Sequence, residues 1–130
     1  MKPTLHVWAM MVAKAVSTRA ECPKRQVGCV LLNKLGHIVS TGYNGPPSGV
    51  SDCSVYCKNQ CKAVHAEINA IKQIRFDDIV VTAVCTCLPC ENCFMNLLNL
   101  TRMTTLVYSE VSKNSIDIKL IPETIKLEKI

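Results

Sequence analysis

Apolar residues recur at intervals of three and four between residues 4 and 20. This spacing predicts an amphipathic helix that packs one face against a core. Two β-rich runs follow at residues 27–32 and 37–41, and Gly36 between them can supply a tight turn. We therefore expect two neighbouring antiparallel strands.

The second half of the chain alternates between helical and extended patterns. Isoleucines recur every three residues in a predicted helix at residues 64–75, and the next run, residues 79–85, is apolar almost throughout. Such a strand is expected to be central and buried on both faces. Pro89 opens a further helix to about residue 100, followed by a strand at residues 104–108. Alternating helices and strands predict an α/β domain with helices on a sheet.

Two segments lack a regular pattern. Residues 42–49 (GYNGPPSG) hold three glycines and two prolines, so we expect a loop of the kind that often carries function. Residues 112–130 alternate only in part, and the pattern leaves three alternatives open: an edge strand, a short helix or a subunit contact. The length of 130 residues suits one domain, residues 1–130.

Composition narrows the functional classes. The net charge of +5 favours anionic partners, and the scattered basic residues suit a phosphorylated small molecule as well as a nucleic acid. No apolar run approaches the roughly 18 residues of a membrane span, and no signal peptide is recognisable. Nine cysteines without a secretory signal suggest metal ligands and buried thiols instead of disulfides. We expect a cytoplasmic protein (in the host cytoplasm if viral) without a membrane partner.

Four residues form the chemically informative pattern. His65, Cys90 and Cys93 offer three zinc ligands at predicted helix starts and leave a fourth position for water, as in catalytic zinc sites. Glu67 lies two residues after the histidine, near the metal yet not needed as a ligand, where a general acid/base is required. An H-x-E motif followed by P-C-x-x-C is the signature of zinc-dependent nucleobase deaminases. The pattern therefore favours hydrolytic deamination.

Five stretches extend the likeness along the chain: CPKRQVG (22–28), GYNGPPSG (42–49), HAEINAI (65–71), TCLPCENC (86–93) and LVY (106–108). With them the chain resembles the zinc-dependent cytidine deaminase superfamily and, within it, the deoxycytidylate (dCMP) deaminases of bacteria and phages. The resemblance implies a three-layer cytidine-deaminase-like α/β fold, a mixed sheet of about five strands flanked by helices. It also implies deamination of dCMP to dUMP, which supplies dTMP synthesis.

The resemblance assigns roles by matching position. Zinc would bind His65, Cys90 and Cys93 and activate water to attack C4 of cytosine, while Glu67 would carry protons to N3 and to the departing amine. The sugar and the base edge would be contacted by Asn44, Ala66 and Leu88.

The phosphate needs cationic or amide partners, and Lys24 and Arg25 are the nearest candidates unless they are a solvated surface pair. Proteins resembling this chain are commonly hexamers, activated by dCTP and inhibited by dTTP with Mg²⁺, so we expect a regulated homo-oligomer with effectors bound near the GYNG loop. The candidates for phosphate or effector binding are Lys24, Arg25, Gly45, Arg75 and Tyr108.

The remaining cysteines fall into two groups. Four of them could close a second, structural zinc site around a segment with few apolar residues, free thiols being the alternative; these are Cys22, Cys53, Cys57 and Cys61. The other three lie in or beside predicted strands and suit small apolar core positions; these are Cys29, Cys85 and Cys87.

Two other functions share these motifs. A deaminase acting on a base within RNA or DNA needs a basic, aromatic-lined groove, whereas this chain has only six aromatic residues, most of them in predicted elements. We therefore expect no nucleic-acid partner. A non-enzymatic, zinc-stabilised binding module would keep its function in Glu67→Gln, but the open ligand position argues against a purely structural site.

Overall fold

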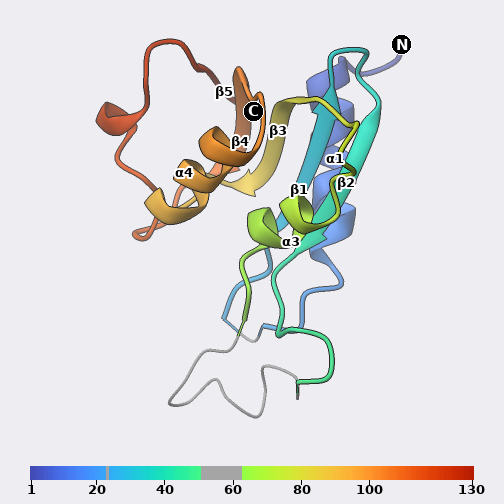
Figure 1. Cartoon of the computed structure of the whole chain (residues 1–130), viewed down its shortest axis with the longest axis vertical. Coiled ribbons are helices and arrows are strands. Elements are labelled where there is room, and N and C mark those ends of the chain that lie inside the picture. The colour runs from blue at the N-terminus through green and yellow to red at the C-terminus, as the bar shows by residue number, and fades with distance from the viewer. Residues whose placement is uncertain (23, 51–62) are drawn as a thin grey trace.

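The computed structural model describes residues 1–22, 24–50 and 63–130. It contains one mixed five-stranded sheet in the order β2-β1-β3-β4-β5, with helices on both faces (Figure 1). The strands are β1 (Gly28–Asn33), β2 (Ile38–Tyr43), β3 (Val80–Cys87), β4 (Thr105–Glu110) and β5 (Lys126–Lys129). The helices are α1 (Leu5–Ser17), α3 (Ala66–Lys72), α4 (Glu91–Leu100) and the short 3-10 helix η1 (Ile118–Leu120).

The sheet is antiparallel on one side and parallel on the other. Strand β1 pairs antiparallel with both β2 and β3, whereas β3, β4 and β5 run parallel. The β1–β2 connection turns at Gly36, whose positive φ of 81° favours glycine. Strand β3 lies in the middle of the sheet, and all of its residues except Val81 are buried. The predictions of a hairpin and of a central apolar strand are therefore confirmed.

The two faces of the sheet carry separate layers of the core. Alternate residues of a strand point to opposite faces, so Val30 and Leu32 pack with α1 while Cys29 and Leu31 pack with α3 and α4. Helix α4 contributes Phe94, a fully buried aromatic side chain. The expected three-layer α/β arrangement is thus confirmed, with α1 on one face and α3 and α4 on the other.

Two glycines allow the helices to lie close to the sheet. A Cβ at Gly28 would overlap the backbone of α1 at Ala13, and a Cβ at Gly42 would overlap the backbone of α3 at Ala66 and Ala70. Glycine is required at both positions because any larger residue would push the helix away. The position of α3 on the sheet, and of the side chains at its start, therefore depends on its close contact with β2.

Several element ends differ from the prediction. The helix expected at residues 64–75 covers only Ala66–Lys72, because the backbone tightens into a turn in which the Arg75 N–H donates to the Asp78 carboxylate at 3.0 Å. The tail contains both an edge strand, β5, and the short helix η1. Within the described ranges, no helix combines the length and the apolar character that a membrane crossing needs.

Candidate metal centre and active site

A cavity of about 240 Å³ opens where β1 begins and β2, β3 and β4 end. Because β1 runs antiparallel to β2 and β3, its first residue lies beside their last ones, and the end of the parallel strand β4 joins them. Residues just outside these strand ends line the cavity, among them Val27, Asn44, Leu88 and Ser112. At about 30 Å³ per liquid water molecule, the volume holds roughly eight waters, which suits a small ring.

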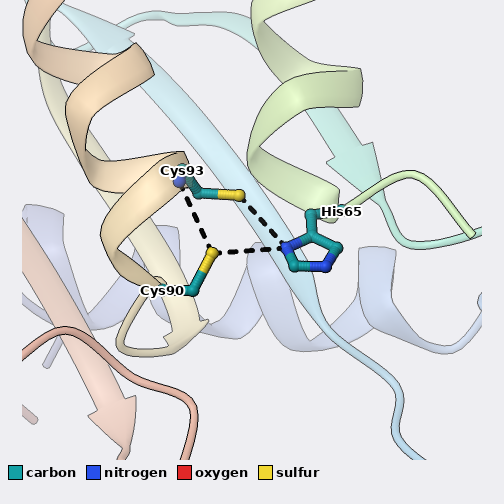
Figure 2. Close-up of side chains that lie close together, drawn as sticks. All are labelled: His65, Cys90 and Cys93. Carbon is teal, nitrogen blue, oxygen red and sulfur yellow. Dashed lines mark hydrogen bonds between the residues drawn. The ribbon is translucent and has the colours of Figure 1, made fainter.

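The starts of α3 and α4 bring three metal-binding side chains together at this cavity. His65 is the N-cap of α3 and Cys90 the N-cap of α4, with Cys93 one turn further on. The Nδ1 atom of His65 lies 3.2 Å from the Cys93 sulfur and 3.5 Å from the Cys90 sulfur (Figure 2). All three ligand atoms lie within 4.8 Å of one another. The predicted ligand set therefore converges in space.

This donor set fits zinc. One imidazole nitrogen and two sulfurs are donors that zinc prefers, and ligands of a tetrahedral zinc ion lie roughly 3.5 Å apart. The two nitrogen–sulfur separations match that spacing without rearrangement. Cys93 is buried, Cys90 half-buried and His65 exposed, so the cluster has one buried side and one side facing the cavity.

The electrostatics of the cluster favour a bound cation. Burial, reinforced by the negative charge of the neighbouring Glu67, raises the pKa of the Cys93 thiol. A metal ion acts in the opposite sense, because a coordinating thiol is deprotonated outright. Metal binding at this cluster should therefore release protons.

Glu67 is the carboxylate of the site. It lies in the first turn of α3, lines the cavity and is only 3% exposed. Burial raises the pKa of Glu67, while its contact with the Cys93 side chain acts in the opposite direction. A carboxyl group whose pKa is raised toward neutrality can both take up and return a proton.

The three predicted substrate-contact residues also line the cavity. The Asn44 side chain accepts the Val27 N–H at 2.8 Å and donates to the Arg25 carbonyl at 2.9 Å, so within the described residues one of its N–H groups and one of its lone pairs have no partner. Leu88 donates its N–H to the Glu110 carbonyl at 2.8 Å. Ala66 begins α3 beside Glu67.

Among the five phosphate or effector candidates, only Arg25 lines the cavity. Lys24 and Arg75 are exposed elsewhere, and Tyr108 is buried in the core. Gly45 pairs with Val64 through hydrogen bonds of 3.1 and 2.7 Å and so guides the chain into α3. Effector roles for these residues stay predictions.

The other cysteines divide as follows. Cys29 and Cys85 are fully buried with their sulfurs 3.6 Å apart, which confirms them as core residues. Cys87 is also buried, but it reaches the cavity wall and accepts a hydrogen bond from the Arg25 guanidinium at 3.1 Å. Cys22 lines the cavity. The other three candidates for a second zinc site lie outside the described residues; these are Cys53, Cys57 and Cys61.

Among the cavity residues that the sequence interpretation missed are two with polar side chains, Ser112 and Asn114. They belong to the segment whose pattern was left open, and they directly follow β4. Their position just after the carboxyl end of a parallel strand could have indicated them as site residues, because ligands of α/β sheets bind outside the carboxyl ends of the strands.

A sequence profile described as the cytidine and deoxycytidylate deaminase zinc-binding region matches residues 3–110, which include His65, Glu67, Cys90 and Cys93. The chain belongs to the cytidine and deoxycytidylate deaminase family. The resemblance indicated by the motifs is thereby confirmed, and the zinc-binding region of the family coincides with the cluster that fits zinc.

Individual members of this deaminase family are similar over most of the chain. A probable deoxycytidylate deaminase of Caenorhabditis elegans is 37% identical over 101 residues, 72% of this chain and 51% of that protein. The deoxycytidylate deaminase of Mycobacterium phage D29 is 29% identical over 128 residues, 85% of this chain and 98% of that protein. The chain spans about half or less of the length of the curated yeast and nematode relatives that it matches.

A solved structure of similar size extends the likeness to the fold. The apo dCMP deaminase of cyanophage S-TIM5 is 25% identical and superposes with a TM-score of 0.82, covering 100% of both chains. This superposition confirms the cytidine-deaminase-like fold that the motifs implied.

Proposed function

We propose that this chain catalyses the zinc-dependent hydrolytic deamination of dCMP to dUMP, supplying dUMP for dTMP synthesis. The observation that carries the proposal is the convergence of His65, Cys90 and Cys93 at a cavity that also contains the buried carboxyl group of Glu67. The choice of dCMP is supported by the relatives named deoxycytidylate deaminase, one of which is a phage protein matched over 98% of its length.

Zinc held by the three ligands supplies Lewis acidity that makes water a nucleophile near neutral pH. The water oxygen would add to C4 while Glu67 takes one of its protons and delivers it to N3 of the cytosine ring. Glu67 would then take the remaining proton from the new C4 hydroxyl and pass it to the amino group, so that the C4–N bond breaks, ammonia leaves and a C4 carbonyl forms. The buried position of Glu67 keeps bulk water away, so the carboxyl group holds the proton between the two transfers.

The cavity wall orients the base. We expect backbone groups around Ala66 and Leu88, both of which line the cavity, to contact the edge of cytosine, and the Asn44 side chain to contact the sugar. The Leu88 carbonyl accepts hydrogen bonds from the Ser115 hydroxyl at 2.6 Å and from the Cys87 thiol at 3.7 Å, so contacts within the chain hold its direction.

The decisive experiment compares Glu67→Gln with Glu91→Gln on zinc-loaded protein. Glu91 begins α4, is exposed and lies outside the cavity lining, so the same chemical change there should leave turnover intact. Glu67→Gln should keep its zinc and lose about 10²–10⁴-fold in kcat. Loss of the absorbance of cytosine with dCMP, deoxycytidine, cytidine and a cytosine-containing single-stranded DNA identifies the substrate. Absence of dCMP turnover in fully zinc-loaded protein would overturn the proposal.

The same assay separates the two rival functions. A polynucleotide deaminase would act on the DNA alone, and it would need a stacking platform, whereas none of the described residues lining the cavity is Phe, Tyr or Trp. A structural zinc module would bind metal yet turn over none of the four substrates, and Glu67→Gln would change nothing.

The family resemblance extends the proposal to regulation and assembly. We expect a homo-hexamer activated by dCTP and inhibited by dTTP with Mg²⁺, and light scattering together with kinetics at several effector concentrations tests both points. Flat kinetics would contradict the regulation. A second zinc ion would involve Cys22, so metal analysis should give two zinc ions per chain and one in Cys22→Ser.

A further inference from the structure

Asn69 is a half-buried polar residue in the middle of the short helix α3. Asparagine is a poor helix former, because its amide competes with the backbone for hydrogen bonds. In a helix of only seven residues this choice costs stability unless the side chain binds elsewhere. The amide nitrogen of Asn69 donates to the Tyr43 carbonyl at 2.9 Å and, more weakly, to the Val64 carbonyl at 3.4 Å. Both acceptors lie outside α3.

These two acceptors determine the direction of the Asn69 amide. An asparagine amide carries two N–H donors on its nitrogen and only lone pairs on its oxygen. If the amide oxygen of Asn69 faced the Tyr43 and Val64 carbonyls, it would be repelled by both, so only the nitrogen can face them. The side chain therefore connects the end of β2 with the segment that leads into α3.

Each of these carbonyls belongs to a peptide unit that leads into a residue of the site. Tyr43 is the last residue of β2 and directly precedes Asn44, and Val64 directly precedes His65. A peptide unit is planar, so a bond that holds its carbonyl also restricts the direction of the next Cα atom. The Asn69 amide thus limits movement between Asn44 and His65, which stand on different segments.

His65 does not cap α3 with its own side chain. Helices often begin with a residue whose side chain accepts a hydrogen bond from the first turn, but His65 forms no such bond. Its ring lies instead against the sulfurs of Cys90 and Cys93 (Figure 2). Asn69 lies one turn further along the helix, and its bond to Tyr43 attaches the start of α3 to β2. The bond therefore supports the helix start where the metal ligand cannot.

We propose that Asn69 is a positioning residue, which keeps His65 and Asn44 at the spacing that the metal and the substrate require. The inference rests on the proposed function for the substrate and on the fit of the histidine and cysteine cluster to zinc. Asn69 does not line the cavity, so it acts through its neighbours. Without its amide, α3 can shift along the end of β2, and the imidazole of His65 loses its 3.2 and 3.5 Å spacing to the two sulfurs.

Asn69→Leu and the matched control Asn96→Leu test the inference. Both asparagines are half-buried, lie in helices and donate to a backbone carbonyl at 2.9 Å, but the bond of Asn96 stays within α4. Leucine has a similar size and suits a helix, but it has no N–H donor in its side chain. We expect Asn69→Leu to weaken zinc binding about 10- to 100-fold in competition with a chelator. Asn96→Leu should weaken it by less than about twofold.

Two further measurements separate positioning from a general loss of stability. The visible absorption of Co²⁺-loaded protein reports the geometry of the ligands, so Asn69→Leu should change the spectrum and Asn96→Leu should not. With dCMP as substrate, Asn69→Leu should lower kcat and raise KM together, because groups on both sides of the bond are displaced. Urea unfolding shows whether each variant is folded. If Asn69→Leu does not fold, Asn69→Ser replaces it, since the short hydroxyl cannot reach both carbonyls.

Zinc affinity and the cobalt spectrum do not depend on turnover, so they separate this inference from the proposed function. If the zinc-loaded wild type deaminates none of the substrates, the proposed function fails, but metal binding still tests Asn69. Weaker zinc binding and an altered cobalt spectrum in Asn69→Leu alone would support the positioning role. Equal zinc affinities and equal spectra in Asn69→Leu and Asn96→Leu would refute it.

Discussion

The close contact between β2 and α3 makes Gly42→Ala a test of how the sheet positions the active site. A Cβ at Gly42 would overlap backbone atoms of Ala66 and Ala70 and would lie 3.0 Å from the Ala70 Cα atom. Carbon atoms in contact normally lie about 3.5–4.0 Å apart, and backbone atoms cannot rotate away as a side chain can. Because Ala66 O and Ala70 N lie even closer than this Cα atom, helix α3 would have to retreat by roughly 1 Å.

A shift of this size affects both stability and chemistry. Overpacking of this kind costs about 1–3 kcal/mol. Helix α3 also carries Glu67 and begins at His65, whereas Cys90 and Cys93 belong to α4, so a retreat of α3 alone separates the two halves of the site. Misplacement of catalytic groups by about 1 Å can cost 100-fold in rate. We expect a 10- to 100-fold lower kcat/KM for dCMP together with the loss of stability.

Gly45→Ala is the matched control. No atom of the described residues lies within 4 Å of a Cβ at Gly45, and its φ is not positive, so the same substitution should change the free energy of unfolding by less than about 1 kcal/mol. Urea unfolding of the zinc-loaded proteins, kcat/KM for dCMP and zinc affinity by competition with a chromogenic chelator measure the three effects. If Gly42→Ala equalled Gly45→Ala in stability and activity, the contact between β2 and α3 would not determine the geometry of the site.

Three other predictions concern buried side chains. The Ser40 hydroxyl is buried without a hydrogen-bond partner in the described structure, so Ser40→Ala should leave the thermal midpoint unchanged or raise it, and a clear decrease would point to a hidden partner. Phe94 is fully buried between α4 and the sheet, so Phe94→Ala should lower the urea-derived free energy of unfolding by about 3–5 kcal/mol, and a loss below 1 kcal/mol would contradict that packing. Zinc binding needs the thiolate forms of Cys90 and Cys93, and burial raises the pKa of the Cys93 thiol, so zinc affinity should fall as the pH is lowered from about 8 to 6. Calorimetry in two buffers of different ionisation enthalpy counts the released protons, and a count of zero would exclude thiolate ligation.

The parts of the fold that could be predicted from the sequence are those with a repeating buried face. The apolar run at β3 and the spacing of apolar residues in α1 each indicate one type of element, so both types were predicted correctly. The predicted ends differ from those in the structure by a few residues. The ends of α3 were less predictable, because they depend on local bonds such as that between Arg75 and Asp78. The parallel pairing of β5 with β4 joins residues distant in the chain, which no local period encodes.

The candidate site divides in the same way. The metal ligands and Glu67 could be predicted because zinc chemistry restricts both the residue types and their spacing. The hydrogen bond between Arg25 and Cys87 joins residues 62 positions apart, so it appears only once β1 and β3 are paired. Asn114 was missed for the same reason, since its place at the cavity depends on the bonds that fasten the turn after β4.

The residues that line the cavity belong to two kinds of backbone segment. His65, Glu67 and Cys90 belong to the starts of α3 and α4, which are locked onto the sheet by the core, whereas Arg25 and Asn114 stand on segments without helix or strand structure. We therefore expect substitutions in those segments to affect which molecule the cavity accepts, while the reacting groups keep their geometry. A search for a different pyrimidine specificity should therefore randomise the strand-end segments and leave both helices intact.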